Sequence, residues 1–336
     1  MSSARSRALS PLRTQSTTSV GSTCWARSPT ATGLALGAAA DLLLGDPRRG
    51  HPVAGFGQLA AAWERRTWRD SRAVGVGYTA LCVGTATALG AAGARLTADR
   101  PGTRTVLTAA TTWAVLGGTS LGRAATTMER QLAAGDLPAA RAHLSTLAGR
   151  DPSGLGEAEL VRATVESVAE NTSDAAVAPL FWGAVAGLPG LLGYRAVNTL
   201  DAMVGYRSTR YARFGWASAR LDDVVNWVPA RLTAALTVLT APLAGGAPAG
   251  ALRAWRRDGA AHPSPNAGRC EAALAGALGL RLGGRNVYGA RVEERPTLGD
   301  GQPPLRGDIR RAARLSRAVW TAAAALAALS RLARRR

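Results

Sequence analysis

The chain has 336 residues and a formal net charge of +19, and it contains no lysine, so all of its strongly basic side chains are arginines. This excludes a Schiff-base lysine and a P-loop lysine, and a bound phosphate must be held by arginine, backbone N–H groups or a metal ion. Aromatic residues make up only 5% of the chain and do not alternate with arginine, so no nucleic acid is expected as a partner. The scattered Cys24, Cys82 and Cys270 indicate neither a disulfide framework nor a zinc site.

The N-terminal stretch differs in composition from the rest of the chain. Residues 1–30 are rich in serine, threonine and arginine and lack an apolar run, so we expect a disordered leader and not a signal peptide. Residues 31–336 are expected to form a single membrane-embedded domain.

Long apolar segments alternate with charged connectors in the remainder of the chain. They predict an all-α, polytopic integral membrane protein with helical and irregular polar loops, located in the cell (cytoplasmic) membrane. Spans are expected at approximately 73–94, 105–122, 175–197, 228–247 and 318–332. Pro189 lies in the middle of the third segment, which either crosses with a kink or re-enters. The arginines that end the chain favour a cytoplasmic C-terminus.

The first polar constellation follows the apolar run 33–45. Asp41 lies inside that run, where a carboxylate is costly and normally marks function. Asp46-Pro47 and His51-Pro52 are turn-forming pairs. Asp46 either binds substrate or caps a helix, while His51 is read as a structural residue at the membrane boundary.

The second constellation is a stripe of carboxylates. Glu166, Glu170 and Asp174 are spaced at i, i+4 and i+8, so a helix would place them on one face. Like charges at this spacing destabilise a helix unless a cation, arginines or water offset them. A hard cation such as Mg²⁺ suits such a site. The alternative is a solvated helix face.

The third constellation spans residues 198–227 and combines amide, carboxylate, arginine and aromatic groups. Asn198 and Asp201 are three residues apart, and Asp222 and Asn226 are four apart, so each pair can converge on one ligand. An amphipathic interfacial helix with neutralising arginines would also explain the aromatics, but not the carboxylate pair Asp222-Asp223 beside an apolar span.

The fourth constellation is the loop His262-Pro-Ser264-Pro-Asn266-Ala-Gly268, which precedes a helical run. Its prolines and glycine predict a rigid loop that opens a helix. The N-terminus of that helix either holds an anion or ends in a plain capped turn.

Taken together, these segments resemble the CobD/CbiB family of cobalamin biosynthesis, which has the activity of an adenosylcobinamide-phosphate synthase. The resemblance runs from about Gly33 to Gly299. It rests on the motifs LLLGDPRRGHPV, GRDPSGL, VESVAENTSD, AVNTLDAMVGYRSTRYARFGWASARLDDVVNWVPARL and HPSPNAG. The chain departs from the family at Arg207, where members often carry lysine, and at Ala175, where glycine is common.

By this resemblance, the protein is expected to join (R)-1-amino-2-propanol, or its O-phosphate, to a propionate carboxylate of adenosylcobyric acid. The product is adenosylcobinamide or its phosphate. Amide formation from a carboxylate is uphill in water, and the resemblance implies ATP and Mg²⁺ for its activation. The implied partners are the corrinoid, the aminopropanol (phosphate) and the lipid bilayer, and a complex with other cobalamin-assembly enzymes is left open.

The residues permit one mechanism under this reading. The metal ligands would be Glu166, Glu170, Asp174 and Asp201. The catalytic residues would be Asp222, Asp223, His262 and Arg220, with one of the carboxylates or the histidine taking the ammonium proton. The substrate-binding residues would be Asp46, Asn198, Arg207, Arg210, Asn226, Ser264 and Asn266.

Two other functions fit part of the pattern. A secondary transporter also has broken helices and intramembrane charges, but no inverted repeat is visible here. A metal-dependent membrane phosphoalcohol transferase would also need clustered aspartates and arginines. A single active site requires the second and third constellations to meet, although an apolar segment separates them.

Overall fold

The computed structural model describes residues 28–47, 50–147, 151–206, 208–288 and 291–333. Of residues 286–288 and 291–293 only the backbone is described. Most of the expected leader, residues 1–27, lies outside the described residues, and so does the expected substrate-binding residue Arg207.

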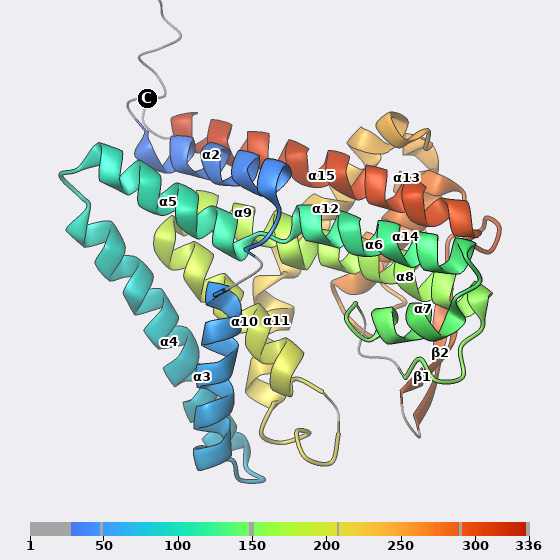
Figure 1. Cartoon of the computed structure of the whole chain (residues 1–336), viewed down its shortest axis with the longest axis horizontal. Helices are drawn as coiled ribbons and strands as arrows, with labels where there is room; N and C mark the ends of the chain where they lie inside the picture. Colours follow the sequence, from blue (N-terminus) through green and yellow to red (C-terminus); the bar gives the residue numbers. More distant parts are fainter. Residues whose placement is uncertain (1–27, 48–49, 148–150, 207, 289–290, 334–336) are drawn as a thin grey trace, which may run out of the picture.

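The described chain is mainly helical, which agrees with the all-α prediction (Figure 1). The N-terminal half contains α2 (Pro29–Leu44), α3 (Pro52–Thr67), α4 (Arg72–Leu96), α5 (Pro101–Val115), α6 (Gly118–Ala133), α7 (Leu137–Leu144) and α8 (Glu157–Thr172). A π-helical turn η1 (Ser173–Val177) leads into α9 (Ala178–Ala186), α10 (Leu188–Val204), α11 (Trp216–Val225) and α12 (Trp227–Thr240). The 3₁₀ turn η2 (Ala241–Ala244), α13 (Pro248–Asp258), α14 (Ala267–Leu278), β1 (Leu282–Tyr288), β2 (Arg291–Leu298) and α15 (Arg306–Ala333) complete the fold.

The helices form two groups that meet at α10 and α11. α2, α5, α6 and α15 lie roughly along the long axis of the molecule, whereas α3 and α4 project away from them (Figure 1). The close approach of α2 to α5 depends on small residues, because a Cβ at Gly33 or Gly37 would collide with Thr108 or Thr112. Such small-residue contacts are typical of helices that pack in lipid.

Helix α8 lies at the centre of the larger hydrophobic core. Its residues from Leu160 to Ala169 are buried apart from Arg162, and they pack with apolar residues of α6, α14 and α15. A separate cluster around Tyr78, Leu200 and Phe214 joins α3, α4 and α10. The C-terminal end of α8, where the acidic stripe was predicted, is therefore held by a rigid core.

Two of the expected spans correspond to suitable helices. Among the residues the structure describes, α4 and the stretch Trp227–Ala244 are long and apolar enough to cross a membrane by length and composition. The expected span 105–122 is divided, because α5 ends at Val115 and the chain is extended at Leu116 before α6 begins. The backbone N–H of Gly117 donates instead to the carbonyl of Ala175 (2.9 Å).

The expected span 175–197 is a tight helical hairpin. α9 ends and α10 begins at Gly187, whose φ of 67° is a conformation that glycine adopts without steric cost. A Cβ at Gly190 would overlap the carbonyl oxygen of Trp182, so the two helices touch at the backbone. The segment therefore returns the chain to the side from which it came.

The antiparallel hairpin of β1 and β2 was not expected from the sequence. It starts at Gly283 and Gly284, which both have a φ of +87°. Arg162 of α8 donates from its guanidinium to the carbonyl oxygens of Gly283 and Arg285. The hairpin is thereby fixed to the central helix.

Replacing Gly190 with alanine should destabilise the hairpin of α9 and α10, because the added methyl group overlaps the backbone of the facing helix. Overpacking of this kind typically costs about 1–3 kcal/mol. Gly84→Ala is the matched control, since a Cβ at this exposed position in α4 meets no atom within 4 Å. Thermal unfolding in detergent should show a lower melting temperature for Gly190→Ala only. Equal melting temperatures for the two variants would contradict the packing described here.

Candidate active site

Residues of the second, third and fourth predicted constellations line one polar cavity of about 350 Å³, and no described residue of the first constellation does. We call it the acidic cavity. Of the predicted site residues, it is lined by Glu170, Asp174, Asp201, Arg220, Asp222, Asp223, Asn226, His262, Ser264 and Asn266. The second and third constellations therefore meet in space, as a single site requires.

The π-helical turn η1 lets the second constellation reach the cavity. In a regular α-helix a step of four residues rotates the side chain by about 40°, so residues eight apart drift by about 80°. The wider turn at Ser173–Val177 changes this drift just where Asp174 lies. π-Helical turns are frequent at functional sites. Glu170 and Asp174 line the cavity together, with Ser173 between them in the lining.

The third constellation is held by a chain of hydrogen bonds. Tyr194 of α10 donates from its hydroxyl to Asn226 Oδ1 (2.9 Å), and Asn226 Nδ2 donates to Asp222 Oδ2 (2.9 Å). Asn226 is only 1% exposed, so its orientation is fixed by these two bonds. The other oxygen of Asp222, Oδ1, is buried and has no hydrogen-bond partner among the described residues.

Three carboxylates of the cavity hold their protons unusually tightly. Burial, followed by the charge of Asp201, raises the pKa of Asp222 to about 8. Burial and then the charge of Glu170 raise the pKa of Asp201 to about 6. Burial and the neighbouring carboxylates also raise the pKa of Asp174 well above its ordinary value. The cause is shared, because like charges in a poorly hydrated space disfavour one another's ionisation.

The loop before α14 closes the cavity. The backbone N–H of Ser264 donates to His262 Nδ1 (3.0 Å), and Ser264 Oγ accepts from the N–H of Ala267 (3.1 Å), which caps α14. Asn266 Nδ2 donates to the carbonyl of Asp223 (2.8 Å) and ties the loop to α11. Ser264 therefore accepts a hydrogen bond from the first residue of α14, as a capped turn predicts, and the loop also lines the cavity.

The carboxylates of the acidic cavity are candidate ligands for a divalent cation. Among the described residues, no three His, Cys, Asp or Glu side chains are close enough to hold one ion by themselves. Mg²⁺, however, is usually bound by one or two carboxylates together with water and substrate phosphate. Glu170, Asp174 and Asp201 line the cavity and offer carboxylate oxygens for such a partly hydrated ion. The cavity fits Mg²⁺ bound in this way.

Glu166 is not brought to the cavity. Its side chain is 1% exposed, and Oε1 accepts from the N–H of Gly283 (2.8 Å). This position does not support its predicted role as a metal ligand. With Arg162, one turn earlier on α8, it anchors the β1–β2 hairpin to the helix.

Asp46 and Asn198 also lie outside the lining. The N–H of Asp46 donates to Ser120 Oγ (3.4 Å), and its buried Oδ1 has no partner among the described residues. Asn198 accepts from Arg195 Nη1 (3.2 Å). A Cβ at Gly117 would lie 3.9 Å from both Asp46 Oδ2 and Arg195 Nη2, so these groups gather at the junction of α5 and α6.

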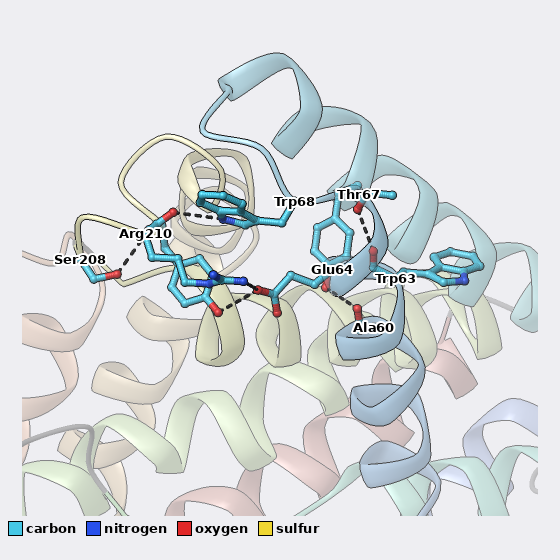
Figure 2. A network of polar contacts seen from close by, with 9 residues as sticks. Ala60, Trp63, Glu64, Thr67, Trp68, Ser208 and Arg210 are labelled. Carbon is cyan, nitrogen blue, oxygen red and sulfur yellow. Dashed lines mark hydrogen bonds and ion pairs between the residues drawn. The ribbon is translucent and has the colours of Figure 1, made fainter.

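Arg210, in the loop between α10 and α11, points towards Glu64 and Trp68 at the end of α3 (Figure 2). Its Nη2 lies 3.0 Å from Glu64 Oε1 of α3, and its guanidinium stacks over Trp68 at 4.6 Å from the ring centroid. Tyr211 donates to the same Glu64 oxygen (2.9 Å). The predicted role of Arg210 in substrate binding is not supported, because these contacts hold the loop against α3.

Several residues of the site were missed from the sequence. Glu271 of α14 is 1% exposed, and its Oε1 lies 3.8 Å from His262 Nε2. Arg295 Nη1 of β2 lies 3.1 Å from the same nitrogen. A lone carboxylate in the alanine-rich run 270–278 was a usable signal. No sequence signal pointed to Arg295, because only the folding of the β1–β2 hairpin brings it close to the loop that contains His262.

Comparison with known proteins shows the family to which the chain belongs. The sequence profile of the family described as CobD/Cbib protein matches residues 34–316. The chain belongs to the CobD/CbiB family. The matched region contains every residue that lines the acidic cavity.

Curated members of the CobD/CbiB family align with most of the chain. The cobalamin biosynthesis protein CobD of Mycobacterium tuberculosis is 55% identical over 301 residues, which cover 89% of this chain and 95% of that protein. The proteins of the same name from Geobacter metallireducens and Rhodobacter capsulatus are 48% and 44% identical, covering 80% and 82% of this chain and 88% and 90% of their own. No solved structure matches the chain significantly.

Asp222→Asn should stabilise the metal-free protein at high pH. The unfolded carboxyl releases its proton near its ordinary pKa of 3.8, whereas the folded one keeps it to about pH 8. The stability that the protonated group contributes is complete below pH 3.8 and is lost as the pH rises through about 8. Thermal unfolding with a chelator should therefore show a higher melting temperature for Asp222→Asn at pH 9 and a much smaller gain at pH 5.

The exposed Asp99→Asn is the control for this change, and it should leave the melting temperature nearly constant at both pH values. A gain for Asp222→Asn that is equal at pH 5 and pH 9 would contradict the buried-charge explanation.

Proposed function

We propose that the protein is a cobalamin-biosynthesis enzyme that forms an amide between adenosylcobyric acid and (R)-1-amino-2-propanol or its O-phosphate. Membership of the CobD/CbiB family and the role of the curated relatives in cobalamin biosynthesis support this proposal. The observation that carries it is the convergence of predicted acidic residues from α8, η1, α10 and α11 on one cavity with the His262 loop.

The reaction needs an activated carboxylate. In the first step of the proposed reaction, the γ-phosphoryl group of ATP moves to the propionate carboxylate, and ADP leaves. The amine nitrogen then attacks the acyl carbon, the ammonium proton moves to a base, and inorganic phosphate leaves with the bonding electrons. Mg²⁺ held by Glu170, Asp174 or Asp201 would neutralise phosphate charge during this sequence.

Asp222 is the best candidate for the base. Its raised pKa, about 8, makes its ionised form, which grows as the pH approaches 8, a stronger base towards an alkylammonium than an ordinary carboxylate. Asn226 fixes the orientation of the carboxylate, while Asp222 Oδ1 stays free of described hydrogen bonds. Asp223 is a weaker candidate, because Arg220 Nη1 already donates to its Oδ2 (3.3 Å). His262 is also a weaker candidate, because its Nδ1 accepts from Ser264 and its Nε2 lies near Arg295 and Glu271.

Anion binding in the cavity would fall to two arginines. Arg220 from α11 and Arg295 from β2 both belong to its lining. Arg220 is exposed and pairs only weakly with Asp223, so it can turn towards a substrate phosphate. A carboxylate-rich pocket with arginines at its rim suits a phosphorylated amine bound next to a metal ion.

We also propose that the protein works as a multi-pass protein of the cell membrane with a cytoplasmic C-terminus. The apolar helices α4 and Trp227–Ala244 support membrane association. The reversal at Gly187 supports a re-entrant segment between the second and third constellations. Both constellations would then open to the same aqueous compartment.

Glu170→Gln and Asp201→Asn should lower product formation by about a hundredfold or more, because each removes a charge from the cation site. The assay uses membranes containing the full chain with adenosylcobyric acid, either amine form, ATP and Mg²⁺. Glu157→Gln is the control on the same helix, since Glu157 is exposed and forms only a long ion pair with Arg306 (3.6 Å). Unaltered product formation by Glu170→Gln would remove the metal site from the mechanism.

ATP consumption separates this enzyme from a transporter. The wild-type protein should hydrolyse ATP only when the corrinoid and the amine are both present, and it should release one phosphate per amide formed. Phosphate release with neither substrate, or substrate movement across vesicles without amide formation, would contradict the proposed reaction.

Single cysteines introduced at Ser153 and Ser208 should react with an impermeant thiol reagent from the same side of the membrane. These positions precede α8 and follow α10, and the two helices meet at the acidic cavity. The experiment uses a background in which Cys24 is replaced by serine, and the native Cys82 and Cys270 are buried and should stay unlabelled in the folded protein. Labelling of the two positions from opposite sides would refute the re-entrant topology.

A further inference from the structure

A second polar groove lies between α6 and α15 and has a volume of about 500 Å³. It shares no lining residue with the acidic cavity. Five arginines line it: Arg123 and Arg130 from α6, and Arg310, Arg314 and Arg317 from α15. We call it the arginine groove. Its arginines carry a charge opposite to that of the carboxylates in the acidic cavity.

The positive charge of the arginine groove is mostly uncompensated within the described part of the chain. Glu129 Oε2 accepts from Arg310 Nη2 (2.8 Å) and neutralises that one guanidinium. No described carboxylate lies within ion-pair distance of the other four arginines. Arg310, Arg314 and Arg317 recur at helical spacing on one face of α15, where like charges repel. A bound anion would offset this repulsion.

The floor of the groove offers a buried hydrogen-bond donor. Trp320 is 1% exposed, and its indole Nε1–H has no acceptor among the described residues. The ring packs against Gly118 and forms part of the groove lining. Unsatisfied buried donors are rare in folded proteins and normally have an acceptor supplied from elsewhere. An anion with several acceptor oxygens would therefore provide the hydrogen-bond acceptor that this donor lacks among the described residues.

The surface next to the groove is apolar. Leu42 at the end of α2 belongs to the lining, and the neighbouring Leu43 and Leu44 are 77% and 62% exposed. Arg123 Nη1 donates to the carbonyl of Leu44 (3.2 Å) and joins the apolar and basic parts. Phosphate matches the arginine donors in charge and geometry, and exposed leucines suit an attached acyl chain.

We propose that the arginine groove binds the phosphate group of a phosphate ester, with the ester carried by an anionic membrane lipid or by a soluble metabolite. The phosphate oxygens accept from Arg314, Arg317 and Trp320. The adjoining leucines favour the lipid. This site is independent of the proposed amide synthesis.

The test uses the full chain purified in a neutral detergent and titrated with two probes, dioctanoyl phosphatidylglycerol and glycerol phosphate. Arg314→Gln/Arg317→Gln removes two exposed guanidiniums of the groove that have no ion pair among the described residues. Arg65→Gln/Arg66→Gln removes the same charge from exposed positions of α3 and is the control. Thermal unfolding of both variants verifies that they are folded.

Saturable binding to the wild-type protein is expected, at least about tenfold weaker in Arg314→Gln/Arg317→Gln and within about twofold of wild type in the control. Tighter binding of phosphatidylglycerol than of glycerol phosphate assigns the lipid source, and equal binding assigns the soluble ester. The proposal is overturned if neither probe binds saturably, if the groove variant binds as tightly as wild type, or if both variants weaken binding equally. None of these outcomes depends on amide formation, so failure here leaves the proposed reaction untouched.

Discussion

Repulsion between carboxylates in a poorly hydrated cavity is the constraint on which the account of this protein depends. Glu170, Asp174, Asp201 and Asp222 come from four separate elements, and burial and their mutual repulsion raise the pKa values of Asp174, Asp201 and Asp222. Such an arrangement costs folding free energy, because each ionised group disfavours its neighbours. Such a cluster of buried carboxylates is useful to a protein only when the carboxylates bind a cation or transfer a proton.

Two backbone features make this arrangement reachable. The π-helical turn at Ser173–Val177 places Asp174 on the same side as Glu170, and Gly187 reverses the chain so that α10 returns to the end of α8. Contacts remote from the cavity hold the rest in place. Glu166 and Arg162 hold the hairpin that carries Arg295, while Glu64 and Arg210 hold the loop before α11. Charged residues that look catalytic in the sequence thus serve to position the site.

The sequence predicted the content of the site better than its architecture. Carboxylates inside or beside apolar runs are costly unless they are used, and this reasoning found Asp201, Asp222 and the His262 loop. It did not anticipate that Glu166 and Arg210 lie outside the acidic cavity, because each has a partner more than a hundred residues away that no local pattern reveals. It also expected a span at 105–122, where Gly117 and Gly118 favour a break between two helices. Helix identity is largely local, whereas side-chain pairing depends on the whole fold.

The most direct measurement of the central claim is the location of Mn²⁺, a spectroscopically visible substitute for Mg²⁺, in the purified protein. Anomalous scattering from Mn²⁺-soaked crystals should place one ion in the acidic cavity, coordinated by at least one of Glu170, Asp174 and Asp201. Signal elsewhere in the molecule, or an empty cavity at saturating Mn²⁺ with nucleotide present, would contradict the idea that these carboxylates gather to hold a cation.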